Sequence, residues 1–142
     1  DSIGRSASVL TLEETRAVWM GKNDFETLLE TVSHANRNLV RLMSEKIRFA
    51  NEQLQALATL NVFGRVARQL LAFSERYGED SGEGEIMITI QLPQREMAGL
   101  VGASRKRVNQ VIVEFKKRDY ISIDQDYRVT VHDRAALARY CR

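Results

Sequence analysis

The chain has 142 residues, of which 44% are hydrophobic and 28% charged, an ordinary balance for a globular protein. No apolar run approaches the roughly 20 residues that cross a bilayer, and no signal peptide opens the sequence, so we expect a cytoplasmic protein without a membrane partner. The charge is uneven, because residues 92–142 hold 11 Lys/Arg against 6 Asp/Glu, whereas residues 1–91 hold 10 against 13. A basic C-terminal third favours a polyanionic partner.

Metal and catalytic chemistry find little support in the residue types. Cys141 is the single cysteine, and His34 and His132 lie far apart in the sequence. One cysteine can form neither an internal disulfide nor a metal centre alone, so we expect no metal site and no evident cofactor. We also find no nucleophile–base pair and no phosphate-cradling glycine loop, and therefore do not expect an enzyme.

The N-terminal segment is β-prone. Residues 5–20 contain short β-favouring stretches and no sustained helical stripe, which predicts the last strands of a sheet that begins outside this sequence. Asn23 would then cap a short helix, with Glu26 at the third helical position as in a capping box. The apolar residues of that helix are Phe25, Leu28 and Leu29.

A long amphipathic helix is predicted from Asn36 to Asn61, where there is neither proline nor glycine. Six of its apolar residues recur in alternating steps of three and four, the a/d spacing of a heptad repeat. These dimer-seam residues are Val40, Met43, Ile47, Ala50, Leu54 and Leu57. We expect them to join two parallel helices in a homodimer. The alternative is a helix buried within a monomer, with Leu39, Leu42 and Phe49 as a second buried face.

A second helix and a strand are predicted after Asn61. The apolar stripe of the helix is Val62, Val66, Leu70 and Phe73. The helix should end before Gly78, and residues 79–85 should form a polar, glycine-rich loop. Residues 86–91 alternate between apolar and polar side chains, which predicts a strand with one buried face.

Two short helices and a hairpin come next. Pro93 opens the first helix, whose core residues would be Met97, Leu100 and Val101. Gly102 suits a helix C′ position with positive φ, and Ser104 suits the N-cap of the following helix. That helix should run from Arg105 to Arg118. Its buried stripe is Val108, Val111, Ile112 and Phe115.

The last elements are two short strands, residues 121–123 and 128–131, and a helix capped by Asp133. Two short helices joined by a tight turn and followed by a β-hairpin form the layout of a winged helix-turn-helix. The second helix would then be the one that enters the major groove of DNA.

The outward side of this helix carries side chains that suit base edges: Arg105, Lys106, Asn109 and Gln110. Arg and Lys donate to guanine O6 and N7, whereas Asn and Gln pair bidentately with adenine. Cations at a helix N-terminus are repelled by its dipole, so a basic start favours a polyanion bound there. Phosphate contacts are expected from Gln94, Ser104 and Arg107.

Two tracts of this chain resemble the Crp/Fnr family of bacterial transcription regulators. Residues 94–105 read QREMAGLVGASR and resemble the family's helix-turn-helix signature. Residues 57–67 read LATLNVFGRVA and resemble its hinge between the dimer helix and the DNA-binding domain. The resemblance covers nearly the whole chain.

The resemblance implies a mainly α fold with small β elements. It divides the chain into the truncated end of an effector-sensing β-roll at 1–33, a dimerisation helix at 34–61, and a winged helix-turn-helix domain at 62–142. It further implies a homodimer that binds a pseudo-palindromic operator in double-stranded DNA under the control of an effector, with RNA polymerase as a further partner. The alternative is a winged-helix and coiled-coil module that binds proteins without reading DNA.

Individual residues follow the family pattern in part. Arg105 matches the base-reading arginine of the family, whereas Lys106 stands where the best-known members have Glu, and Gln110 where they often have a second Arg. We therefore predict that this chain does not prefer the half-site TGTGA.

An effector site is implied only by the resemblance. Arg5 and Ser6 resemble the end of a phosphate-binding cassette, and Asn51, beside Ala50, stands where cAMP-binding members place Thr-Ser against adenine. These residues make a cyclic nucleotide the candidate effector of the intact protein. An iron–sulfur sensor is disfavoured because residues 1–33 contain no cysteine.

Overall fold

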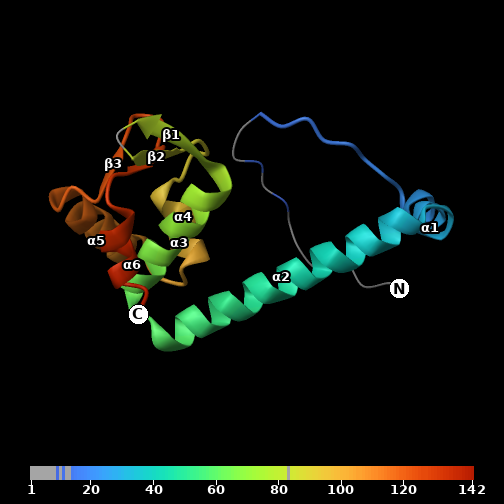
Figure 1. Ribbon diagram of the computed structural model, residues 1–142, viewed down its shortest axis with the longest axis horizontal. Coiled ribbons are helices and arrows are strands. Elements are labelled where there is room, and N and C mark those ends of the chain that lie inside the picture. The colour runs from blue at the N-terminus through green and yellow to red at the C-terminus, as the bar shows by residue number, and fades with distance from the viewer. Residues whose placement is uncertain (1–8, 10, 12–13, 83) are drawn as a thin grey trace.

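A long helix connects a short N-terminal helix to a packed C-terminal head, residues 60–142 (Figure 1). The computed structural model describes residues 9, 11, 14–82 and 84–142. Helix α1 spans Lys22–Thr31 and helix α2 spans Ser33–Thr59, which projects away from the head. None of the helices in these ranges is both long and apolar enough to cross a membrane.

The junction between α2 and the head is set by Asn61. Helix α2 ends at Thr59, and helix α3 spans Val62–Tyr77. The Asn61 side-chain oxygen accepts a hydrogen bond from the Gly64 backbone N–H at 3.0 Å and thereby caps α3. An N-cap residue has extended backbone geometry, so the chain must turn here. The predicted interruption at Asn61 is confirmed.

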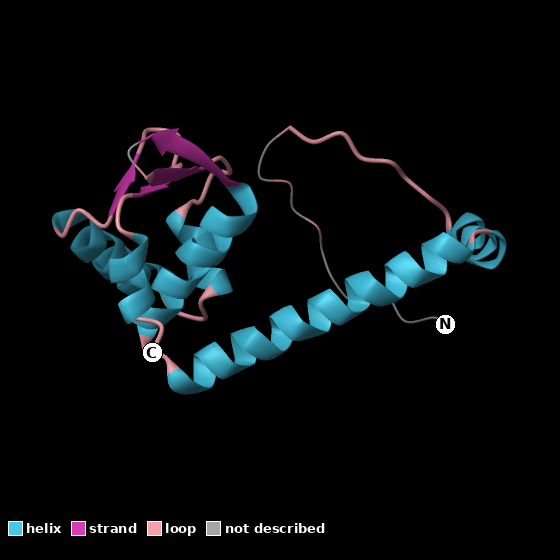
Figure 2. Cartoon of the chain, viewed as in Figure 1, coloured by secondary structure: helices cyan, strands magenta, loops and turns pink. Residues whose placement is uncertain are grey.

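The head combines helices with a small antiparallel sheet (Figure 2). Its other helices are α4 (Gln94–Leu100), α5 (Arg105–Lys117) and α6 (Arg134–Arg139). Its strands are β1 (Gly78–Gly82), β2 (Glu85–Ile88), β3 (Ile121–Ile123) and β4 (Val129–Val131), in the spatial order β1-β2-β4-β3. In the register, Val131 pairs with Ile86 on one side and with Ile121 on the other. The mainly α fold with small β elements is thus confirmed.

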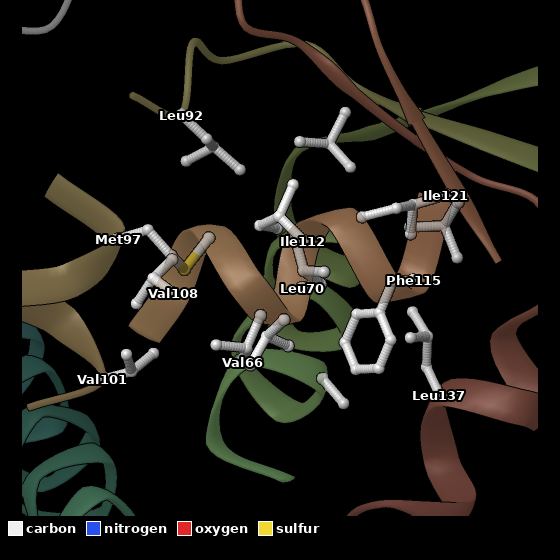
Figure 3. Packing of buried hydrophobic residues seen from close by; sticks show 14 of the residues in the cluster. Val66, Leu70, Leu92, Met97, Val101, Val108, Ile112, Phe115, Ile121 and Leu137 are labelled. Carbon is white, nitrogen blue, oxygen red and sulfur yellow. The ribbon is translucent and has the colours of Figure 1, made fainter. Parts of the chain in front are cut away.

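One hydrophobic core holds the head together, and Phe115 of α5 lies in it with no exposed surface. Figure 3 shows Val66 and Leu70 of α3 and Leu137 of α6 gathered around its ring. Phe115 also meets the rings of Phe63 and Tyr140 edge-on, at centroid distances of 5.9 Å and 5.2 Å. Helices far apart in the sequence are therefore joined through α5.

Two N-terminal predictions were wrong. Helix α1 begins at Lys22 with Gly21 as its N-cap and no side-chain cap, so Asn23 and Glu26 form no capping box. Glycine is an adequate N-cap, and Asn23 therefore lies inside the first turn. Among residues 5–20, those that the structure describes belong to no strand. A strand needs a hydrogen-bonded neighbour, and the described strands β1–β4 pair only with one another.

Three predictions in the head also needed correction. The loop expected at 79–85 contains β1, whose side chains are all exposed because it is an edge strand with no buried face. The strand expected at 86–91 is β2, which ends at Ile88. Leu100 is 45% exposed, and Ala98 takes its place in the core.

Candidate nucleic-acid interface

The turn between α4 and α5 has the backbone geometry that its sequence predicts. Gly102 has φ of +58°, in the left-handed region that glycine enters without steric cost. The Ala103 N–H donates to the Ala98 carbonyl at 3.1 Å, and the Ser104 hydroxyl accepts from the Arg107 N–H at 3.3 Å. The turn therefore ends one helix and caps the next.

Helix α5 is held by its inner side. Val108, Val111 and Phe115 are fully buried and Ile112 is 5% exposed, as the predicted stripe requires. Because four core residues fix the rotation of the helix about its axis, the opposite side is held outward.

The outward side of α5 carries the predicted base-reading residues, all of them exposed: Arg105, Lys106, Asn109 and Gln110. Helical periodicity places Lys106 and Gln110 furthest from the buried stripe. Arg105 and Asn109 lie on the flank towards α4, and Arg107 lies on the other flank. No acidic residue stands in the first turn of α5.

On the flank towards α4, Gln94 of α4 forms a hydrogen bond with Asn109 on the outward side of α5. Its Nε2 donates to Asn109 Oδ1 at 2.9 Å. Gln94 also lines a hollow together with Arg95, Arg105 and Tyr127. Tyr127 has φ of +61° at the β3–β4 hairpin, and its carbonyl accepts from the Leu92 N–H at 2.9 Å. Arg95 and Tyr127 are not among the residues predicted from the sequence. A basic residue inside the helix-turn-helix tract was the available signal for Arg95.

On the opposite flank, Arg107 Nη1 donates to Gln110 Oε1 at 3.0 Å. Both residues line a groove with the N-terminal end of α3 and with Arg118. Arg118 Nε donates to Glu114 Oε1 at 2.8 Å, and this hydrogen bond is the main cause that raises the pKa of Arg118. Positive charge thus borders the outward side of α5 on both flanks.

Arg65, which was not predicted from the sequence, connects the hinge to the turn between α4 and α5. Its Nε donates to the Val101 carbonyl at 2.7 Å, and its Nη1 donates to the Leu60 carbonyl at 2.9 Å. The turn also lies against α2, because a Cβ at Gly102 would stand 2.9 Å from Leu57 Cδ2. The end of the long helix and the turn between α4 and α5 are therefore in direct contact.

The dimer-seam residues of α2 lie uncovered. Ala50 is exposed, and the other five are between 47% and 66% exposed. Leu42 and Phe49 are also about half exposed, at 51% and 48%, and Leu39 is half-buried, so these three residues form no fully buried second face in the described part of the chain. Ala56 is the one buried residue of α2.

The three proposed effector residues are described only in part. Asn51 is exposed on α2, and Arg5 and Ser6 lie outside the described residues. Across the described ranges, no group of three or more His, Cys, Asp or Glu residues could hold a metal ion.

Comparisons with known proteins agree with this architecture. Residues 64–140 match the sequence profile of the Crp-like helix-turn-helix domain. The chain is 35% identical over 138 residues to the CRP-like cAMP-activated global transcriptional regulator of Mycobacterium tuberculosis, an alignment that covers 97% of this chain and 61% of that protein. The chain therefore spans about three fifths of the length of this relative.

Solved structures give the same result. A transcriptional regulator of the CRP/FNR family from Thermus thermophilus superposes with a TM-score of 0.65 at 25% identity, covering 76% of this chain and 54% of that one. A CooA variant from Carboxydothermus hydrogenoformans superposes with a TM-score of 0.77 at 18% identity, covering 84% and 55%. At 18% identity, the likeness to the CooA variant shows a shared fold alone.

Proposed function

The chain belongs to the Crp/Fnr family of bacterial transcription regulators, and from this premise we propose that it binds a pseudo-palindromic DNA operator as a homodimer. Residues 62–142 would read the DNA, residues 34–61 would join the two copies, and residues 1–33 would be the end of the sensor. Operator binding requires a cytoplasmic location.

The observation that carries the proposal is the basic start of α5. Arg105, Lys106 and Arg107 are exposed together at the N-terminal turn, on a helix whose other side is locked into the core. The helix dipole makes this placement unfavourable in a free helix. A DNA backbone supplies the opposite charge, while base edges accept hydrogen bonds from the same side chains.

A second copy of the chain would cover the dimer seam. Heptad-spaced apolar residues pack knobs-into-holes when two helices run side by side. Two α5 helices would then enter successive major grooves about 34 Å apart, which demands half-sites with matching spacing.

Control by an effector is the remaining part of the proposal. The mycobacterial relative is described as cAMP-activated, so a cyclic nucleotide is the first effector to test on the intact protein. The effector would shift α2 relative to the head through the contact of Leu57 with Gly102, and this requires two states that bind it with different affinity. RNA polymerase would be a further partner.

The test is fluorescence anisotropy of this chain on a palindromic pool selected for binding, titrated with salt. We expect site-selective binding whose log–log salt slope steepens by about −0.9 for each phosphate contact. Arg105→Ala should remove the site preference, whereas Arg41→Ala, an equal loss of charge on exposed α2, should not. A TGTGA duplex should bind more weakly than the selected site, and equal or tighter binding would contradict the predicted lack of preference for TGTGA.

The competing function is a protein-binding module, which the uncovered dimer seam would also suit. It gives no role to the basic turn of α5. Equal affinity for selected and random DNA at every salt concentration, repeated with the intact sensor and candidate nucleotides, would favour that function.

A further inference from the structure

Gln94 and Asn109 come from different helices of the head, and their contact bears on how α5 reads DNA. Gln94 is the first residue of α4 and is half-buried, whereas Asn109 is exposed on the second turn of α5. The two helices contact each other, and Met97 of α4 and Val108 of α5 both lie in the core (Figure 3). The core therefore fixes the backbone on both sides of the contact, and only the two side chains remain free to rotate.

The hydrogen bond between these side chains sets the orientation of the Asn109 amide. Gln94 Nε2 donates to Asn109 Oδ1 at 2.9 Å. A side-chain amide has one oxygen with two lone pairs and one NH2 group with two donors. The bond from Gln94 occupies one lone pair, which leaves the second lone pair and the NH2 group of Asn109. An acceptor and a donor therefore remain for DNA, in an order that Gln94 decides.

The orientation of the Gln94 amide has a cause of its own. Gln94 lines a hollow together with Arg95 and Arg105. A guanidinium donates hydrogen bonds and accepts none, so the two arginines favour the Gln94 oxygen on their side of the amide. Its NH2 group is then on the side of Asn109. Reversal of both amides would turn the Gln94 NH2 group towards two cations.

Adenine is the base whose major-groove edge matches this order. It presents the N6 amino group as a donor and N7 as an acceptor, so the Asn109 oxygen would accept from N6 while the Asn109 NH2 group donates to N7. Guanine presents two acceptors, O6 and N7. Its O6 would face the Asn109 oxygen, and two acceptors form no hydrogen bond. Guanine therefore fits only if the Asn109 amide turns over and gives up the bond from Gln94.

We infer that Asn109 reads an adenine of the half-site and that Gln94 is a positioning residue, which acts through Asn109 by holding its amide for adenine rather than guanine. This inference rests on the proposed function, and it gives Gln94 a role beside the expected phosphate contact. A phosphate contact strengthens binding to every sequence alike, whereas positioning changes the ratio of affinities for adenine and guanine at one position.

The first test replaces each adenine of the selected half-site in turn with guanine or with 7-deazaadenine, which lacks N7. At one position guanine should lower affinity by about fivefold to about 150-fold, the range for a bidentate pair, and 7-deazaadenine should cause part of that loss. 3-Deazaadenine is the matched control, because it alters only the minor-groove edge. Asn109→Ala should tolerate both replacements at that position. A selected half-site without such a position would overturn the inference alone, whereas failure to select any site would overturn the proposed function as well.

The second test separates positioning from phosphate contact. Gln94→Met removes the amide and keeps the length of the side chain. It should lower the ratio of adenine to guanine affinity at that position by about twofold to about tenfold, the effect of one hydrogen bond. In the Asn109→Ala chain the same substitution should leave the ratio unchanged, since the partner is gone. An equal loss of affinity for adenine and guanine duplexes would assign Gln94 to phosphate alone and overturn the inference.

Two charged variants test the direction of the hydrogen bond. Gln94→Lys keeps a donor towards Asn109 and should keep the adenine preference, although it tightens binding to all DNA. Gln94→Glu offers acceptors alone, so Asn109 must turn its NH2 group towards it, and the adenine preference should be lost. Each ratio compares two duplexes with the same protein preparation, so the altered charge and the folded fraction cancel. An adenine preference that survives in Gln94→Glu would contradict the inference.

Discussion

Helices α2 and α5 are both amphipathic, yet their apolar sides have opposite surroundings. The stripe of α5 is at most 5% exposed, whereas five dimer-seam residues of α2 are 47% to 66% exposed. The stripe of α5 is covered by α3, α6 and the sheet of the same chain, whereas the dimer seam of α2 stays largely exposed in the described part of the chain. The same sequence pattern therefore predicts a helix equally well in both places, but it does not tell whether the covering surface belongs to the same chain.

The boundary between the two regions lies in the last turns of α2. Glu52 accepts from Arg68 of α3 at 3.1 Å, and Gln53 donates to Gln69 of α3 at 3.1 Å. Ala56 is buried against the head at 2% exposure. The C-terminal end of α2 is therefore fixed to the head. The predictions below separate the two regions.

The largest effect is expected from a charge in the seam. Ile47→Asp would bury a carboxylate in each chain of the proposed dimer, at a cost on the order of 3–5 kcal/mol per chain. Sedimentation velocity should show a monomer, with thermal melting of the head unchanged. Arg48→Asp, beside the seam, should leave the dimer intact. A dimer that survives Ile47→Asp would show that the copies do not meet at this seam.

The counterpart in the head is Phe115→Ala. Removing this buried ring should lower the free energy of unfolding of the head by about 3–5 kcal/mol, measured by denaturant melting. Val113→Ala on the exposed side of α5 should change it by less than about 0.5 kcal/mol. Similar losses in the two variants would mean that α5 is not locked as described.

Arg65 tests the connection between the regions. Arg65→Met keeps the aliphatic stem and leaves the carbonyls of Leu60 and Val101 without their charged donor, which should cost about 1.5–3 kcal/mol. Hydrogen exchange should quicken around residues 101–103 while the rest of the head keeps its protection. Arg65→Lys keeps one donor group, so its exchange rate at residues 101–103 should lie between those of the original chain and Arg65→Met. Uniform loss of protection across the head would instead indicate a global role.

Several local features could be predicted because their causes lie within a few residues. The positive φ of Gly102, the cap by Ser104 and the break at Asn61 follow from side-chain chemistry at the position itself. Arg65 could not be found in this way, since its partner Val101 lies 36 residues further along the chain.

The remaining misses have similar causes. Strand β1 has no apolar alternation, because an edge strand with no buried face needs none. The contact of Gln94 with Asn109 also depends on how α4 and α5 pack, so the sequence named both residues without showing that they meet. The candidate site was predicted as a set of residue types, and its hydrogen-bonding pattern required the fold.

The smallest effect concerns Cys141, whose burial raises the pKa of its thiol. Its thiolate fraction at pH 8 should be reduced, and alkylation should be slower than at an exposed cysteine, by about a fewfold. Cys141→Ser combined with Arg48→Cys supplies the exposed reference on α2. Because folding raises the pKa of Cys141, the protonated thiol stabilises the folded state slightly. This contribution is complete below the usual pKa of a thiol, and it is lost as the pH rises through the raised pKa of the folded protein. Equal alkylation rates would contradict the difference in solvent protection.

The open seam of α2 has a consequence for gene dosage. In the proposed regulator, operator occupancy follows the number of paired chains rather than the number of chains. When most copies are single, halving their concentration lowers the paired population about fourfold by mass action. A promoter controlled by this protein would therefore respond steeply to the expression level of the regulator, before any effector acts.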